Sequence, residues 1–229
     1  MNEHFRNLPE SDNLNTFALS RLFSRKTTSY KFLFFLSLLD ILDRNNFDAS
    51  SPIEFRELVV GMLVNAWFPH HYFNLSFGTQ DKITYKLDSL RLQISESALN
   101  LTDFNKNCLR EAINKQNLED IVAYIVRYVP FRLITPFLKT ELKGIDIDHG
   151  VDRETPRLAR LYFESHKPLY CFDSTDRSEC NAIIIHPEWA LYLQQNHFLI
   201  REWVCWEWVK YMQARNPKVL DIETQLFPQ

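Results

Sequence analysis

The sequence predicts a mainly α-helical protein: a multi-helix, bundle-like domain with a small antiparallel β-hairpin inserted near residues 160–186. Three observations predict this class. Only four of the 229 residues are glycine, and helices avoid glycine because it costs backbone entropy. Hydrophobic residues make up 45% of the chain and aromatic residues 14%, which suits a bulky core. Apolar residues also recur at helical spacing behind capping residues in several segments.

The first two thirds of the chain are expected to form a polar, loose arm at residues 1–14 and a helical core at 15–143. The segment 30–44 is apolar on most sides, which predicts a central helix. Pro69 is expected to end the helix that begins at Ser51-Pro52. The expected helices cover residues 15–24, 30–44, 52–67, 81–95, 102–115 and 117–129, with a short one from 135.

The last third of the chain changes character at Gly144. Residues 144–157 are charged and are expected to form a loop. The runs 169–172 and 182–185 are β-branched and aromatic, which predicts a hairpin within a 144–186 insertion. A lone hairpin is marginally stable, so this one is expected either to lie against helices or to pair with a third strand, for which 161–163 is the candidate. Helices over 187–195 and 197–215 return to the same domain as its C-terminal part (187–217), and 218–229 is expected to be an extended tail.

Charge, cysteines and hydropathy narrow the class of protein. The net charge is −3 and both signs are spread along the chain, so no basic block predicts wholesale phosphate binding. The four cysteines form no CxxC pair, which disfavours a zinc site and indicates reduced thiols. The longest apolar run, residues 32–41, is too short to span a bilayer. We therefore expect a cytoplasmic protein without membrane contact.

An unusual segment between residues 67 and 82 combines aromatic side chains, two adjacent histidines, a proline and a glycine. We interpret it as a structural junction: a helix that stops at the proline, an aromatic plug, and a turn at the glycine. The two histidines are expected to point apart and to have no carboxylate partner, which disfavours a shared metal. The junction residues are Trp67, Pro69, His70, His71, Tyr72, Phe73, Phe77 and Gly78.

A basic cluster lies over the first turn between helices and comprises Arg21, Arg25, Lys26 and Lys31. Hydroxyl side chains are interleaved with it. Hydroxyls, free helix N–H groups and cations are the groups that contact a phosphate backbone. These four residues are therefore the DNA-contact candidates. The alternative is a solvated helix end.

Two further groups of residues have a structural and a functional interpretation. Asp146, Asp148 and His149 have the chemistry to hold a metal or activate water, but a solvated loop is favoured. Three tryptophans crowd the last long helix, and Trp203 and Trp206 are expected to share a face. Core packing is favoured there over stacking on bases. No catalytic motif is present, and no residue is assigned a catalytic role.

Four short strings, spread in order over most of the chain, carry a family resemblance. They are Leu19–Phe23 with Thr27–Phe32; Trp67–Pro69 with Tyr72–Phe73, Leu75–Gly78 and Gln80–Lys82; Val129–Arg132; and Pro187–Trp189 with Tyr192–Leu193, Asn196 and Arg215–Pro217. Together they resemble the N-terminal region of bacterial HNH endonuclease domain proteins of the restriction or phage-defence type. The string around residues 67–82 is the most specific.

The resemblance implies a helical region followed by a compact ββα-metal nuclease module. That module uses a histidine base and a divalent metal to cleave phosphodiesters. It is expected beyond residue 217 and is absent from this chain, so no cofactor is expected here and the metal belongs to the missing module. Asp148-His149 resembles the module's Asp-His pair but lacks the proline, asparagine and histidine that should follow. No catalytic role is carried onto it.

The leading hypothesis is a non-catalytic helical region of an HNH-type endonuclease. It would contact or orient duplex DNA, or mediate assembly, next to a downstream HNH module. The first alternative is a protein-interaction or regulatory domain, such as a homo-oligomer, without nucleic-acid contact. The second is a metal-dependent enzyme that uses the cluster at residues 146–149.

Overall fold

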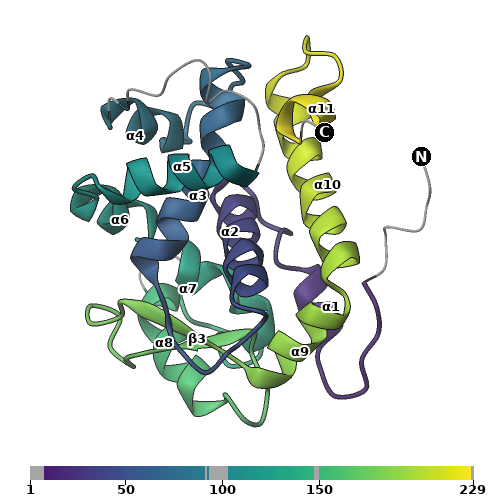
Figure 1. The fold of residues 1–229 in the computed structure, drawn as a ribbon. Coiled ribbons are helices and arrows are strands. Elements are labelled where there is room, and N and C mark those ends of the chain that lie inside the picture. The colour runs from purple at the N-terminus through teal and green to yellow at the C-terminus, as the bar shows by residue number, and fades with distance from the viewer. Residues whose placement is uncertain (1–7, 91, 93–102, 147–149, 228–229) are drawn as a thin grey trace.

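A long central helix organises the fold. The computed structural model describes residues 8–90, 92, 103–146 and 150–227. Helix α2 (Tyr30–Arg44) lies between α3 (Phe55–His71) and α10 (His197–Arg215), and both neighbours run antiparallel to it (Figure 1). The shorter helices and one small sheet surround this trio. The arrangement confirms a mainly α-helical protein with a small β insertion.

The remaining elements fill in around the trio in chain order. The bounds of α9 (Pro187–Gln195), α10 and α5 (Asp103–Asn114) lie close to those that the sequence predicts. The other helices are α1 (Thr16–Ser20), α4 (Ile83–Ser89), α5 (Asp103–Asn114), α6 (Glu119–Ile125), α7 (Val129–Leu133), the 3₁₀-helix η3 (Thr135–Leu138), α8 (Val151–Leu161), α9 (Pro187–Gln195) and α11 (Ile222–Leu226).

Helix α2 is buried along nearly its whole length because α3 and α10 cover opposite sides of it. On the α3 side, Gly61 faces Ser37, whose hydroxyl donates to the carbonyl of Leu58 at 2.8 Å. A Cβ at residue 61 would lie 2.9 Å from the Ser37 Cβ. The missing side chain of Gly61 therefore allows the two helices to approach closely.

A hydrogen-bonded cluster of polar side chains joins all three long helices. The carboxylate of Asp40 on α2 accepts from Arg201 Nη1 of α10 at 2.6 Å and from Asn65 Nδ2 of α3 at 3.0 Å. Both carboxylate oxygens of this partly buried group are thereby paired, so the charge inside the bundle is satisfied. This cluster fixes the positions of α3 and α10 along the axis of α2.

The small sheet contains three antiparallel strands in the order β1-β3-β2. The predicted hairpin is confirmed as β2 (Tyr170–Phe172) and β3 (Ala182–Ile185). The expected third strand at 161–163 is wrong, because residue 161 ends α8. The third strand is instead β1 (Ile53–Glu54), where Ile53 pairs with Ile183. A segment about 130 positions away in the chain supplies the pairing that a lone hairpin needs.

Two segments expected to lack regular structure are helical. Residues 151–161 form α8 rather than a loop, with Val151, Thr155, Leu158 and Ala159 buried on one face. The charged residues on the opposite face obscured this spacing in the sequence. The expected tail contains α11, whose Ile222 and Leu226 are buried one turn apart. Amphipathic spacing in short helices is therefore the signal that was missed.

Pro69 does not end α3, which continues to His71. Proline removes one N–H and crowds the carbonyl four residues earlier, so it costs least near a helix end. The helix closes beyond it: the Tyr72 N–H donates to the Phe68 carbonyl, and the Leu75 N–H donates to that of Pro69. Asn74 adopts a left-handed φ of 52° and reverses the chain.

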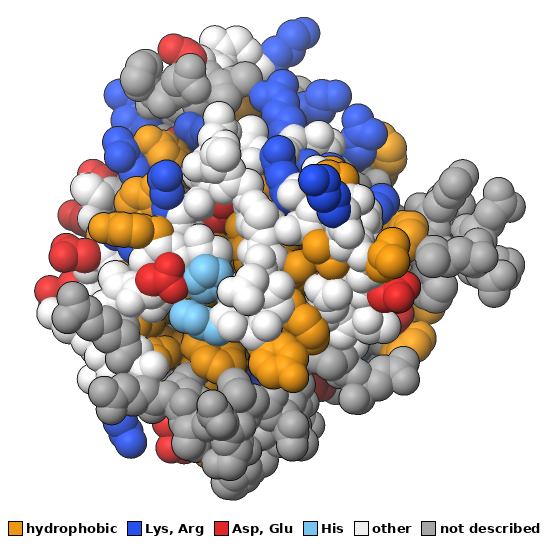
Figure 2. All heavy atoms as spheres, turned by 90° about the horizontal axis from the view of Figure 1, so that it is seen from above, with side chains coloured by type: hydrophobic (Ala, Val, Ile, Leu, Met, Phe, Trp, Pro, Cys, Tyr) orange, Lys and Arg blue, Asp and Glu red, His pale blue; other side chains and the backbone are white. Residues whose placement is uncertain are grey.

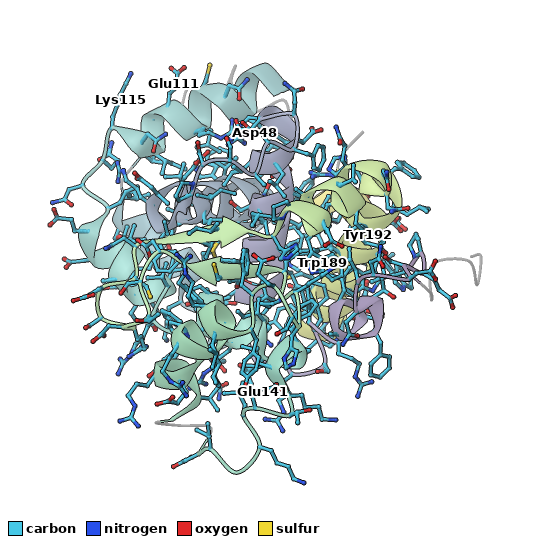
Figure 3. The ribbon with its side chains drawn as sticks, turned by 90° about the horizontal axis from the view of Figure 1, so that it is seen from below. Asp48, Glu111, Lys115, Glu141, Trp189 and Tyr192 are labelled. Atoms are coloured by element: carbon cyan, nitrogen blue, oxygen red, sulfur yellow. The ribbon has the colours of Figure 1, made fainter. Side chains whose placement is uncertain are left out.

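The start of the described chain is attached to the fold rather than loose. The Tyr192 hydroxyl on α9 donates to the Pro9 carbonyl at 2.6 Å, and Leu14 is buried. Trp189 lies edge-on to Tyr192, with ring centroids 5.3 Å apart (Figure 3). The expectation of a loose arm is therefore wrong for residues 8–14. Among the described residues, no helix is long and apolar enough to cross a membrane.

Candidate nucleic-acid interface

A hollow of about 910 Å³ opens between α1, the turn before α2, η3 and the start of α8. We call it the basic hollow. Phe17, Phe137, Ile145 and Val151 contribute apolar surface to its wall. The other described residues that line it are Asn15, Ala18, Arg21, Ser24, Arg25, Thr27, Lys31, Arg132, Thr135, Pro136, Lys139, Thr140, Leu142 and Gly144.

Five cationic side chains line this hollow, and none of its described lining residues is acidic. Arg21, Arg25 and Lys31 belong to the basic cluster seen in the sequence. Arg132, in α7, and Lys139, directly after η3, line the same hollow. Sequence reasoning missed these two because they lie about 100 positions from the cluster, with no charge pattern that links them to it. Four hydroxyl side chains, Ser24, Thr27, Thr135 and Thr140, lie among the cations.

Lys31 is partly buried in the wall of the hollow. Its Nζ donates to the Leu22 carbonyl at 3.1 Å. Burial, followed by the charges of Arg25 and Arg132, lowers the pKa of Lys31 to about 8. A cation whose neighbours make it easier to deprotonate lies in a positive potential, which favours a bound anion.

Arg132 is held in a fixed orientation on the wall of the hollow. Its Nε donates to Asp152 Oδ1 and its Nη2 donates to Asp152 Oδ2, both at 2.8 Å. Asp152 is buried, and the Arg132 guanidinium also lies 4.4 Å from the centroid of the Tyr128 ring. Bidentate pairing and stacking preorganise the guanidinium. Asp152 also cancels part of the charge that Arg132 brings.

An exposed aromatic ring lies at the same hollow. Phe17 is 73% exposed, although it is a large apolar side chain, and the Arg21 guanidinium lies 5.8 Å from its ring centroid. Aromatic rings beside cationic side chains are the surfaces on which nucleobases stack. The hollow therefore combines phosphate-binding and base-stacking groups.

Lys26 does not belong to the basic hollow, although it is adjacent to Arg25 in the sequence. Its Nζ pairs with Glu207 Oε2 on α10 at 3.0 Å and lies 5.9 Å from the Phe32 ring centroid. Among the described residues, it is not part of the hollow's lining. The structure thus divides the four DNA-contact candidates into three that converge and one that points to α10.

The Asp/His cluster at residues 146–149 lies largely outside the described residues. Asp148 and His149 are not described, and Asp146 is exposed. The carbonyl of Asp146 accepts from the N–H groups of Gly150 and Val151, at 2.9 and 3.0 Å, where α8 begins. The described part of this segment therefore has a structural role at a helix start.

The two adjacent histidines do not point apart. His70 Nε2 lies 2.8 Å from Asp88 Oδ1, and His71 Nε2 lies 3.8 Å from the same oxygen. Their ring centroids are 4.6 Å apart. From above, two histidine side chains lie beside an acidic one on the surface (Figure 2). The expectation of diverging rings without a carboxylate partner is therefore wrong.

The rest of the junction packs as a joint between α3 and the end of α10. Trp67 and Phe77 are buried. The Asn216 side chain pairs with both backbone groups of Ser76, each at 2.8 Å, and the Tyr211 hydroxyl donates to the Phe77 carbonyl at 2.7 Å.

Gly78 has a φ of +99°, which favours glycine. The plug is looser at its edge, where Tyr72 is exposed and stacks on Phe68 beside Phe73.

The tryptophans of α10 serve mainly in packing. Trp203 contacts Phe23, with ring centroids 5.0 Å apart, and Trp208 is buried against Phe227. Trp206 is only partly buried and lies near Lys210. The preference for core packing is confirmed for Trp203 and Trp208. Residues 203 and 206 are three positions apart in the continuous helix α10, as expected for a shared face, and Trp208 contacts a different partner from Trp203.

No family model matches the chain, and searches of curated proteins and of solved structures found no match.

Proposed function

We propose that this chain binds the phosphate backbone of duplex DNA through the basic hollow. The observation that carries the proposal is the convergence of Arg21, Arg25, Lys31, Arg132 and Lys139 on one concave surface whose described lining has no acid. The chain has a net charge of −3, so this convergence is local and does not follow from composition. Local clusters of this kind bind phosphates by releasing condensed counterions.

The hollow's other groups support a nucleic-acid ligand over a simple inorganic anion. Hydroxyl groups donate hydrogen bonds to phosphate oxygens without adding charge. The exposed Phe17 ring offers a stacking surface for an unpaired base, such as one at a DNA end, which an isolated anion would not use. A backbone contact of this kind positions a protein on DNA and carries little sequence preference.

In this proposal the chain is a non-catalytic helical region of a cytoplasmic, HNH-type restriction or phage-defence endonuclease. Its resemblance to that family supports this setting. The chain would hold DNA for a downstream HNH module, and the divalent metal and the histidine base would belong to that module. The basic hollow would then set the orientation of the duplex rather than cut it.

The test is fluorescence anisotropy of a labelled DNA duplex titrated with the protein at low salt. The triple variant R21A/R25A/K139A removes three cations and leaves Lys31 and Arg132, which have buried or paired surroundings. We expect its affinity to fall by about 10- to 100-fold, in keeping with the loss of several phosphate contacts.

The matched control is K26A, which removes a cation from the same sequence cluster but not from the basic hollow. Its affinity for duplex DNA should equal that of the wild type. Weak, equal binding by all three proteins, or a larger loss for K26A than for the triple variant, would refute the proposed interface. Thermal unfolding of each variant verifies that the fold is retained.

A second candidate function is assembly without nucleic-acid contact. Leu191, Phe198 and Leu199 lie close together in sequence across the α9–α10 connection and are 53%, 71% and 45% exposed. Contiguous exposed apolar patches mark interaction surfaces, and these three side chains would supply the apolar groups of one. A homodimer through this surface would give twice the chain mass in light scattering, and F198S would convert it to a monomer. A monomer in the wild type argues against this function.

A further inference from the structure

Three side chains that can ligate a metal gather where α3 ends against α4. His70 and His71 lie in the last turn of α3, and Asp88 lies in the last turn of α4. One ligand atom from each lies within 4.8 Å of the other two. These residues are about 17 positions apart in the chain, and the basic hollow does not include them among its described lining.

The spacing of the three ligand atoms suits a transition metal. Bonds of about 2.0–2.1 Å to imidazole nitrogen and carboxylate oxygen place neighbouring ligand atoms of a tetrahedral site about 3.3 Å apart. The distances from Asp88 Oδ1 to His70 Nε2 and His71 Nε2 are 2.8 and 3.8 Å. These distances lie on either side of the required value. The three ligand atoms all lie within 4.8 Å of one another, so rotamer adjustments of the two imidazoles and the carboxylate would admit an ion.

The surrounding packing holds the ligands in place. The His71 ring lies 5.2 Å from the Trp67 ring, one helical turn earlier, and Trp67 is itself buried. Helix α4 is anchored by the buried Ile83 and Leu87, so Asp88 projects from a fixed turn. Both supports belong to the core and not to the ligand set. The cluster is therefore preorganised on two helix ends rather than on a loop.

The chemistry of the ligand set also suits a divalent cation. Imidazole binds metals in its neutral form through a ring nitrogen, and the carboxylate of Asp88 supplies the oxygen ligand. The groups facing the cluster from α3 and α4 among the described residues are these two imidazoles and one carboxylate, so the ligand set has one negative charge.

We propose that His70, His71 and Asp88 bind one divalent transition-metal ion of the zinc type, with water completing the coordination. Two imidazoles and one carboxylate favour Zn²⁺, Co²⁺ or Ni²⁺ over Mg²⁺ and Ca²⁺, which prefer oxygen ligands. Three protein ligands leave at least one position open. The ion links the end of α3 to the end of α4 and stabilises the joint between them.

A simpler explanation is an ion pair between His70 and Asp88 without a metal. The 2.8 Å contact between them is compatible with it. That explanation gives no role to His71, and it predicts that the Tm of the protein does not depend on added metal. Metal binding by the proposed site requires all three side chains, and this requirement separates the two explanations.

The test is calorimetric titration of chelator-treated, full-length protein with Zn²⁺, together with the visible absorption spectrum of the Co²⁺ form. All proteins carry C108S, because Cys108 is an exposed thiol that binds soft metals. We expect one ion per chain and a Co²⁺ spectrum typical of a four- or five-coordinate site. Zinc at about 100 times its Kd should raise the Tm by about 5 to 10 °C.

The variants H70Q, H71Q and D88N each remove one ligand with little change in volume. Each should weaken zinc binding by more than about tenfold, a loss that even outer-shell changes cause in metal sites. The control is H166Q, which breaks a different histidine–carboxylate pair, with Glu141 at 3.3 Å. It should leave zinc affinity unchanged.

Melting curves in chelator show whether each variant folds as the wild type does. A variant that folds and still binds zinc with wild-type affinity would overturn the proposed site, as would the absence of any zinc-dependent heat or Tm shift in the wild type. If H71Q alone keeps wild-type zinc affinity, His71 is not a ligand and the three-residue site is refuted; if no variant and no wild-type protein binds zinc, the ion pair between His70 and Asp88 is the better account.

Discussion

The close approach of α2 and α3 at Gly61 gives a prediction that can be worked from the structure. In G61A, the new Cβ would overlap the Ser37 Oγ and lie 2.9 Å from the Ser37 Cβ. Both groups are buried on facing helices, so neither can move into solvent. The change should therefore force the helices apart or twist Ser37 out of its rotamer.

Three contributions set the size of the effect. Overpacking a core costs about 1–3 kcal/mol. Displacing the Ser37 hydroxyl from the Leu58 carbonyl, 2.8 Å away, costs about 1 kcal/mol. Replacing glycine by alanine inside a helix returns about 1 kcal/mol. We expect a net loss of about 1–3 kcal/mol in the free energy of unfolding.

Urea denaturation followed by far-UV circular dichroism measures this loss. The swapped variant S37G/G61A is the control, because it moves the small residue from α3 to α2 and leaves the Ser37 Cα, at 3.5 Å, as the nearest atom. Its stability should lie within about 1 kcal/mol of the wild type, since the two helix propensity changes cancel. If G61A were as stable as the wild type or more stable, the packing of α2 on α3 described above would be incorrect.

Three further predictions concern single side chains. Lys31 has a pKa of about 8 in the folded protein, below the usual 10.5. Between these two pH values the unfolded chain binds more protons than the folded one, so the free energy of unfolding rises with pH. The variant K31M should lose this rise of about 1–3 kcal/mol, measured by urea titrations at pH 8 and pH 10.5. N216A removes three hydrogen bonds, to Ser76 N, Ser76 O and Met212 O, and should lower the unfolding free energy by about 2–3 kcal/mol; an unchanged urea midpoint would contradict the joint. F17A should weaken binding of single-stranded DNA by about 1–3 kcal/mol without affecting the Tm, and equal affinity in anisotropy would remove the stacking role of Phe17.

The long helices could be predicted because their own residues specify them. Helix α2 is apolar on most sides, and the structure buries ten of its fifteen residues. Its bounds agree with the expected range of 30–44. The hairpin strands were equally clear from their β-branched runs. The third strand could not be predicted, because Ile53–Glu54 is too short to show a pattern and pairs through tertiary contact alone.

Two short helices, α8 and α11, were difficult to recognise in the sequence because few of their residues are apolar. In α8 the buried face contains small and polar residues such as Thr155 and Ala159, so its apolar signal is weak next to its charged face. At α11 only two residues are buried. In both cases a short helix depends on packing against its neighbours more than on its own propensity.

The candidate sites were only partly visible in the sequence for the same reason. Arg21, Arg25 and Lys31 are near neighbours in the chain, and they do converge. Arg132 and Lys139 reach the same hollow only through folding. Similarly, the His70–His71 pair was evident, but its partner Asp88 becomes visible only when α4 folds back on α3.

Three of the four sequence strings singled out in the sequence analysis meet in the fold. Ser76 of the second string is paired with Asn216 of the fourth, and Ser29 of the first donates its N–H to Asp81 of the second at 2.6 Å. Burial raises the pKa of Asp81, while hydrogen bonds from Ile83 and Ser29 oppose the shift. Residues of these strings therefore make packing contacts between helices, and the contacts described here are structural rather than catalytic.

The salt dependence of duplex DNA affinity tests the proposed function most directly. Each phosphate contact adds about 0.9 to the slope of log Kd against log salt concentration. The account predicts that R21A/R25A/K139A lowers the wild-type slope by about 2–3, whereas K26A leaves it unchanged. Equal slopes for all three proteins, or no measurable binding by the wild type at low salt, would contradict the assignment of the basic hollow as the DNA-contacting surface.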